Sequence, residues 1–178
     1  MKKIVVISSS LRLNSNSEIL ADGFIKGAKE NGNKVDKIIL RDQKLLFCCG
    51  CLSCQKNGRC FQDDFVNGVL DIIQEADILV FATPIYYYSI SGQLKTFLDR
   101  LNPLYVRKNS FKEIYLIATS ADKERSAMDG AIREIENWAS CFNGTRLTKV
   151  FYGTGFTGAG ETMNTEVYQE CFASGKEI

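Results

Sequence analysis

The chain has 178 residues, of which 45% are hydrophobic, and its formal net charge is +1. This length suits one domain with a substantial core, and the balanced charge argues against disorder and against a nucleic-acid partner. Histidine is absent, which excludes a Ser-His-Asp triad and any histidine-ligated metal.

The sequence begins MKKIVVISSS, in which two lysines precede only four apolar residues before the serines. That run is too short for the core of a signal peptide and far too short to span a membrane. It is typical of a buried first strand, so we expect a cytoplasmic protein with no membrane partner. In that compartment clustered cysteines more often bind metal or take part in redox chemistry than form structural disulfides.

Short apolar runs alternate with amphipathic stretches along the whole chain. The runs predict strands at 3–8, 35–40, 78–82, 113–119 and 147–152. Helices are predicted at 17–32, 91–101, 123–141 and 164–173, and another is expected after the N-cap candidates Asp63 and Asp64. Nearly continuous apolar strands joined through helices indicate a parallel sheet covered on both faces. No linker or repeat divides the sequence, so we expect one α/β domain over 1–178.

The loop after the first strand, SSSLRLNSNS at 8–17, opens directly onto a helix. A helix N-terminus with free N–H groups suits a phosphate, and ligands in such sheets bind beyond the carboxyl ends of the strands. Further hydrogen bonds can come from Ser10, Arg12, Asn16 and Ser17. The loop has no glycine, so it is not a dinucleotide fingerprint. The alternative is a plain capping box formed by Ser15 and Glu18.

The segment at 83–100 reads TPIYYYSISGQLKTFLDR. Three consecutive tyrosines after a buried strand are hard to place in a core, because each hydroxyl needs a partner. They could flank a planar aromatic ligand, or they could form a surface patch or a subunit interface. Ligand binding and a subunit interface are both consistent with the tyrosines if the ligand lies at that interface.

These two segments together resemble the flavodoxin-like NAD(P)H-dependent FMN reductase family, including its iron–sulfur flavoprotein branch. The resemblance covers about 1–160. It implies a flavodoxin-like three-layer sandwich with five parallel strands in the order 2-1-3-4-5. It also implies a homodimer or homotetramer with FMN near a subunit interface.

The resemblance further implies a set of FMN-binding residues. The phosphate would be held by Ser10, Arg12, Asn16 and Ser17, with Asn14 nearby. The isoalloxazine ring would be lined by Thr83, Pro84, Ile85, Tyr86 and Tyr87, and its pyrimidine edge would be approached by Thr119, Ser120, Ala121 and Asp122. No catalytic acid or base is assigned, since hydride transfer from NAD(P)H to a flavin needs stacking geometry more than a protein proton donor. The phosphate loop departs from many relatives in lacking a glycine or proline.

The segment CCGCLSCQKNGRC at 48–60 holds five of the seven cysteines. Cys48, Cys51, Cys54 and Cys60 have the spacing C-x2-C-x2-C-x5-C, which suits a [4Fe–4S] cluster and resembles the motif of the iron–sulfur flavoproteins. Structural zinc, a dithiol–disulfide pair and packed free thiols are the alternatives. Similar cysteine segments also belong to the pattern of plain flavin reductases.

The function expected from these features is an FMN-dependent oxidoreductase. It would pass a hydride from NAD(P)H to bound FMN and on to a quinone, a flavin or another small-molecule acceptor. One alternative is an iron–sulfur flavoprotein that exchanges electrons with a ferredoxin-like carrier. The other is a non-catalytic flavodoxin-like module that senses redox state or binds a partner.

Overall fold

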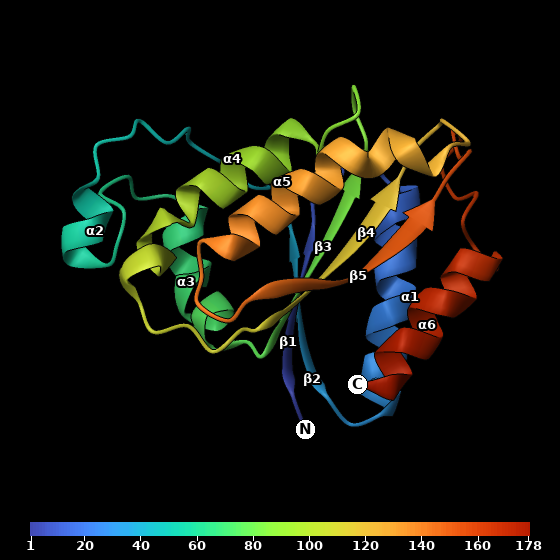
Figure 1. The fold of residues 1–178 in the computed structure, drawn as a ribbon, viewed down its shortest axis with the longest axis horizontal. Coiled ribbons are helices and arrows are strands. Elements are labelled where there is room, and N and C mark those ends of the chain that lie inside the picture. The colour runs from blue at the N-terminus through green and yellow to red at the C-terminus, as the bar shows by residue number, and fades with distance from the viewer.

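The computed structural model describes all residues from 1 to 178 and shows a five-stranded sheet between two layers of helices (Figure 1). All strands are parallel, in the order β2-β1-β3-β4-β5. Their bounds are β1 (Lys3–Ser8), β2 (Lys34–Ile39), β3 (Ile78–Pro84), β4 (Glu113–Thr119) and β5 (Arg146–Gly153). The predicted flavodoxin-like fold class and strand order are therefore confirmed.

Five helices cover the two faces of the sheet (Figure 1). One face carries α1 (Asn16–Glu30) and α6 (Glu166–Glu177), and the other carries α3 (Phe65–Glu75), α4 (Gly92–Arg100) and α5 (Asp129–Ser140). Shorter pieces are the helix α2 (Ser53–Asn57) and the 3-10 turns η1 (Asn102–Val106) and η2 (Arg125–Met128). No helix is long and apolar enough to cross a membrane.

Two predicted helix starts are wrong for identifiable reasons. The helix expected at 123–141 starts later, because Asp122 accepts the N–H of Glu124 (2.9 Å) and forms a turn in its place. The last helix cannot include Asn164, whose φ of +61° is left-handed, and Thr165 caps it instead. Within the cysteine segment, the short helix α2 forms between left-handed Leu52 and Gly58.

The sheet separates two hydrophobic cores by the alternation of its side chains. In β1, Val5 and Ile7 face α3, α4 and α5, whereas Ile4 and Val6 face α1 and α6. Successive side chains of a strand point to opposite faces, so both faces must be apolar when both are covered. The sheet interior is thus fully buried, and polar groups are left to its edges.

Helices α1 and α6 pack with their backbones in contact. A Cβ atom added at Gly27 would overlap the carbonyl oxygen of Phe172, and one added at Gly175 would overlap that of Phe24. Two glycines on facing helices therefore allow the close crossing. Because the serine-rich loop leads directly into α1, this crossing fixes the helix to which that loop is attached.

Replacement of Gly27 by alanine should lower the free energy of unfolding by about 1–3 kcal/mol, since the added methyl group forces the helices apart. Gly68, inside α3, has open space around its Cβ position. Gly68→Ala should therefore raise the free energy of unfolding by about 0.5–1 kcal/mol through helix propensity. Urea titration of both variants tests the close crossing, and effects of the same sign would contradict it.

Candidate functional site

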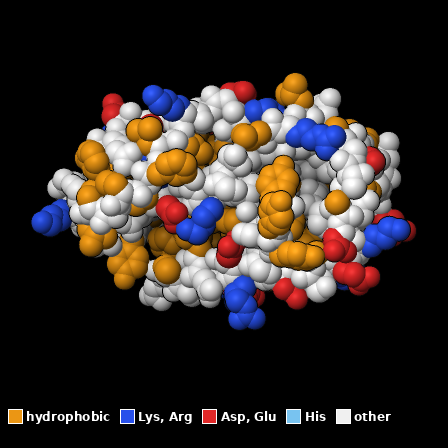
Figure 2. Space-filling model, turned by 90° about the horizontal axis from the view of Figure 1, so that it is seen from above, with side chains coloured by type: hydrophobic (Ala, Val, Ile, Leu, Met, Phe, Trp, Pro, Cys, Tyr) orange, Lys and Arg blue, Asp and Glu red, His pale blue; other side chains and the backbone are white.

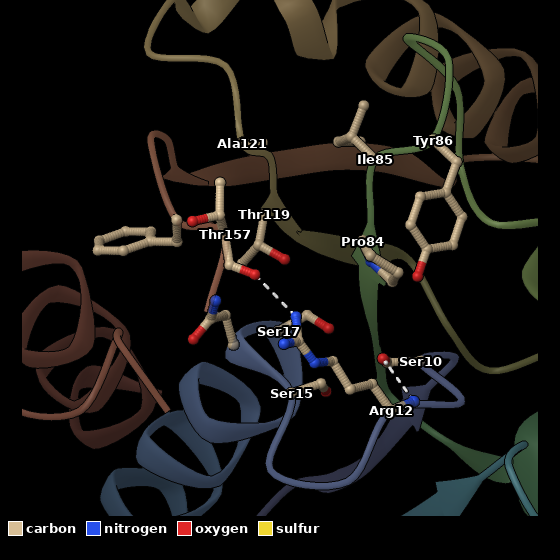
Figure 3. Close-up of a pocket in the computed structure, with 12 residues that line it drawn as sticks. Ser10, Arg12, Ser15, Ser17, Pro84, Ile85, Tyr86, Thr119, Ala121 and Thr157 are labelled. Atoms are coloured by element: carbon tan, nitrogen blue, oxygen red, sulfur yellow. Dashed lines mark hydrogen bonds between the residues drawn. The ribbon is translucent and has the colours of Figure 1, made fainter. Parts of the chain in front are cut away.

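A cleft of about 250 Å³ lies at the carboxyl ends of β1, β3, β4 and β5 (Figure 3). The strand order reverses between β1 and β3, and ligands of open α/β sheets bind outside such a reversal. Figure 2 looks onto this side of the molecule and shows hydrophobic side chains in several separate groups there. The cleft is lined by Ser10, Arg12, Ser15, Asn16, Ser17, Pro84, Ile85, Tyr86, Thr119, Ala121, Phe156 and Thr157.

The floor of the cleft is the N-terminus of α1. Ser15 caps the helix by accepting the N–H of Glu18 (3.3 Å), while the N–H groups of Asn16 and Ser17 have no hydrogen bond. The hydroxyl of Ser17 is fully buried and also lacks a partner. Buried polar atoms are nearly always paired, so these free donors indicate a site for an anion.

Arg12, in the loop before α1, gives the cleft its positive charge. Its Nη1 donates to the carbonyl oxygen of Thr157 (2.8 Å), and its backbone N–H donates to Ser10 Oγ (3.2 Å), as Figure 3 shows. The single contact at Nη1 leaves the other guanidinium donors free for a ligand. Arg12 is the one charged side chain that lines the cleft.

Glu18, the acidic residue next to this site, forms ion pairs with two cationic side chains of the protein. Burial alone would raise the pKa of Glu18, but hydrogen bonds from Arg41 and Lys37 outweigh it and bring the pKa below its ordinary value. Glu18 is therefore ionised and paired with two cations. Since its side chain is occupied by them, the capping-box alternative holds only for Ser15.

The loop after β5 closes one side of the cleft. Asn16 Nδ2 donates to the carbonyl oxygen of Gly158 (2.7 Å), and the N–H of Gly160 donates to the carbonyl oxygen of Asn14 (3.0 Å). Asn16 Oδ1 also accepts the N–H of Thr162 (3.3 Å). The amide of Asn16 thus holds the loop, and Asn14, with a φ of +51°, contributes its backbone.

The opposite wall comes from β3 and the turn that follows it. Pro84, Ile85 and Tyr86 line the cleft, whereas Thr83 is buried behind them and accepts the N–H of Ser91 (3.1 Å). Tyr87 is 100% exposed and lies outside the lining. The structure thus divides the predicted ring-binding residues into three that border the cleft and two that do not.

Beyond Tyr86 the chain makes a tight hairpin turn. The N–H of Tyr86 donates to Ser89 O (3.0 Å) and that of Ser89 donates to Tyr86 O (3.1 Å). Between them, Tyr87 and Tyr88 have φ values of +49° and +64°. Such left-handed conformations cost about 1–2 kcal/mol for each residue with a side chain. Turns of this kind normally carry Asn-Gly.

The loop after β4 supplies Thr119 and Ala121 to the cleft. Ser120 is buried and donates its hydroxyl to the carbonyl oxygen of Asp122 (2.8 Å), so these two residues shape the turn. Nine of the fourteen predicted FMN residues therefore line the cleft, and the five that do not are Asn14, Thr83, Tyr87, Ser120 and Asp122.

Three lining residues were not among the predicted FMN-binding residues. Ser15 adjoins predicted ones, but Phe156 and Thr157 come from the loop after β5. Their signal is the glycine-rich sequence GTGFTGAG at 153–160, which directly follows a strand of the sheet. A loop at that position must lie at the same edge as the other three.

The cysteine segment lies over the ends of α3 and α4, away from the cleft (Figure 1). Cys48 and Cys51 are exposed, Cys60 is partly buried, and Cys54 is buried and accepts a hydrogen bond from Asn102 Nδ2 (3.2 Å). Burial raises the pKa of the Cys54 thiol, although that hydrogen bond opposes the rise. The donor chemistry suits an iron–sulfur cluster. However, no three Cys, His, Asp or Glu side chains are gathered as a metal would require, so the cluster stays a prediction.

A buried ion pair attaches this segment to the core. Arg100, only 1% exposed, donates to both carboxylate oxygens of Asp64 (2.6 and 2.8 Å). The same guanidinium donates to the carbonyl oxygens of Leu46 (2.8 Å) and Gln62 (3.2 Å). Burial opposes the charge of Arg100, but Asp64 raises its pKa above the ordinary value. One cation therefore binds the beginning and the end of the segment.

Comparison with known proteins agrees with this geometry. The family model of the NADPH-dependent FMN reductases matches residues 2–153. The chain belongs to this family. The predicted family is thereby confirmed, and FMN and NADPH are the cofactor and co-substrate named for it.

Three similar proteins illustrate the range of the NADPH-dependent FMN reductase family and its fold. An iron–sulfur flavoprotein of Archaeoglobus fulgidus is 33% identical over 57% of this chain and 46% of its own, so the match spans about half of that relative. YwqN of Bacillus subtilis, named as an NAD(P)H-dependent FMN-containing oxidoreductase, is 30% identical over 69% of each chain. The structure of an azoreductase from Bacillus anthracis superposes with a TM-score of 0.74 over the full length of both chains, at 19% identity.

Removal of the buried cation should be costly to this FMN reductase-family protein. Arg100→Met should lower the free energy of unfolding by about 3–5 kcal/mol, because it leaves the carboxylate of Asp64 buried without a partner. The matched control is Lys95→Met, which breaks an exposed ion pair on the same helix and should cost about 0.5 kcal/mol or less. Denaturant unfolding measures both, and similar costs would show that Arg100 does not anchor the segment.

Proposed function

We propose that the chain acts as a single FMN-binding domain whose cleft holds the FMN phosphate at the N-terminus of α1. The observation that carries this proposal is the buried hydroxyl of Ser17, which has no partner and sits beside two free N–H groups. A phosphate would satisfy these donors, and Arg12 would add a charge-assisted hydrogen bond. The family to which the chain belongs supports FMN as the group concerned.

The residues around the phosphate site fit the rest of such a cofactor. Pro84, Ile85 and Tyr86 offer an apolar and aromatic wall for a planar ring, and Thr119 and Ala121 border it from the next strand. Bound FMN would supply the hydride-accepting chemistry. The side chains of this protein would bind and orient it and limit the access of water.

The activity that this arrangement supports is an NAD(P)H-dependent oxidoreductase reaction with a small acceptor such as a quinone or a flavin. The cleft is lined by no His, Asp, Glu or Lys, the side chains that most often act as general acids and bases. Hydride transfer needs none. We further propose that the protein acts as a homodimer or homotetramer, because the exposed tyrosines beside the cleft suit an interface.

Titration with FMN tests the phosphate assignment. Arg12→Ala should weaken FMN binding about tenfold or more, as expected for a lost hydrogen bond to a charged group, and Ser17→Ala should weaken it several-fold. Arg146→Ala is the control, because Arg146 begins β5 at the opposite edge of the sheet. Fluorescence quenching of FMN gives the affinities. A wild-type protein that binds no FMN would refute the proposal and favour the non-catalytic module.

A second function is favoured by the cysteine spacing and by relatives named iron–sulfur flavoproteins. In that function Cys48, Cys51, Cys54 and Cys60 would hold a [4Fe–4S] cluster, and the partner would be a ferredoxin-like electron carrier. The segment is attached through backbone carbonyls and through the amide of Asn67, which bonds Cys60 and Gln62. The thiols of Cys48 and Cys51 are exposed and make no hydrogen bond, so both are available as ligands.

Thiol labelling distinguishes these two functions independently of activity. After anaerobic purification with iron and sulfide, a cluster should protect Cys48, Cys51, Cys54 and Cys60 while Cys49 and Cys141 still react, because both of these are exposed. Iron content and thiolate-to-iron absorption should rise together with that protection. Equal labelling of Cys48, Cys49 and Cys51, with no iron, would leave the plain FMN reductase. Cys171 should stay unlabelled in either case, since burial raises its pKa far above the ordinary value.

A further inference from the structure

The turn at Tyr87 and Tyr88 combines two unfavourable features. Both residues adopt left-handed backbone conformations, and their side chains are 100% and 65% exposed. Exposed aromatic rings gain little from burial that could offset this strain. The turn must therefore be held by contacts outside itself.

Those contacts come from α5. The hydroxyl of Ser89 lies 3.0 Å from each carboxylate oxygen of Glu134, and the N–H of Ile90 donates to Glu134 Oε2 (3.3 Å). A second contact is steric, because a Cβ atom added at Gly130 would overlap the carbonyl oxygen of Tyr88. Glu134 and Gly130 lie one helical turn apart, so a single face of α5 holds the turn.

The position of Tyr86 follows from this hold. Two backbone hydrogen bonds join Tyr86 to Ser89, whose hydroxyl is bound by Glu134. On its other side, the N–H of Ile85 donates to the carbonyl oxygen of Thr119 (2.8 Å). Tyr86 therefore lies between one anchor on the sheet and one on α5, and its side chain borders the cleft (Figure 3).

We propose that Glu134, which does not line the cleft, is a positioning residue for the wall that would face the FMN ring. It holds the strained Tyr87–Tyr88 turn and thereby sets the place of Tyr86. This inference rests on the proposed function, because it assumes that the cleft binds FMN. It adds a residue of α5, a helix that contributes nothing to the lining, to the machinery of the site.

The first test compares three variants by FMN titration. Glu134→Ala should weaken FMN binding about tenfold, because it removes a charged acceptor from both Ser89 and Ile90. Glu134→Gln keeps an acceptor oxygen of the same reach and should recover most of the affinity. The control is Glu136→Ala, because Glu136 is exposed on the same helix and its side chain forms no hydrogen bond or ion pair, and this variant should match the wild type.

The second test relieves the backbone strain of the turn, so that the turn no longer needs the contact with Glu134. Tyr87→Asn combined with Tyr88→Gly places Asn-Gly in the turn, and this pair adopts the left-handed conformations readily. In that background Glu134→Ala should change FMN affinity less than twofold, as expected for residues that act through one shared element. The midpoint potential of bound FMN should shift on Glu134→Ala in the native background only.

The outcomes separate this inference from the proposed function. If the wild-type protein does not bind FMN, both the proposed function and the positioning role of Glu134 are wrong. If the wild type binds FMN and Glu134→Ala leaves affinity and potential unchanged, only the positioning role is overturned. An equal loss of affinity in the native and Asn-Gly backgrounds also overturns it, because Glu134 would then act by another route.

Discussion

Parallel pairing of all five strands is the constraint on which the cleft depends. Since every strand runs in the same direction, the loops after β1, β3, β4 and β5 emerge at one edge of the sheet. Helices cover both faces, so the strands themselves are apolar and polar groups collect in those loops. The buried sheet thus places the free donors of the first turn of α1 at the edge where these four loops meet.

Within the cleft, hydrogen bonds divide between those that build it and those left free. The side chain of Asn16 and the backbone of Asn14 form hydrogen bonds with the loop after β5, and the side chain of Ser15 caps α1. What remains free is the hydroxyl of Ser17, the first N–H groups of α1 and most of the Arg12 guanidinium. Loop closure by neutral amides thus preserves a positive site for an anion.

The sequence was sufficient for the sheet and for the centre of the site. Apolar runs placed the five strands, and the serine-rich loop with the tyrosine segment supplied seven of the predicted cleft residues, because these signals are local. The sequence was insufficient where tertiary contacts determine a helix boundary or the position of a side chain. The side chain of Asp122 delays the start of the expected helix, and nothing in the segment TPIYYYS indicates that Tyr87 lies outside the cleft while Tyr86 lines it. The hydrogen bond between Ser89 and Glu134 joins residues 45 positions apart, and no sequence pattern predicts it.

Helix α4 connects the two regions that carry the chemistry. At its N-terminus, the cap Ser91 donates its hydroxyl to Ser9 (2.9 Å) in the loop after β1. At its C-terminus, Arg100 binds the cysteine segment through Asp64, Leu46 and Gln62. Its nine residues span about 13 Å. A rigid helix with a buried anchor at each end thus fixes the distance between cleft and cysteines, so the two regions form one framework even where the thiols themselves are exposed.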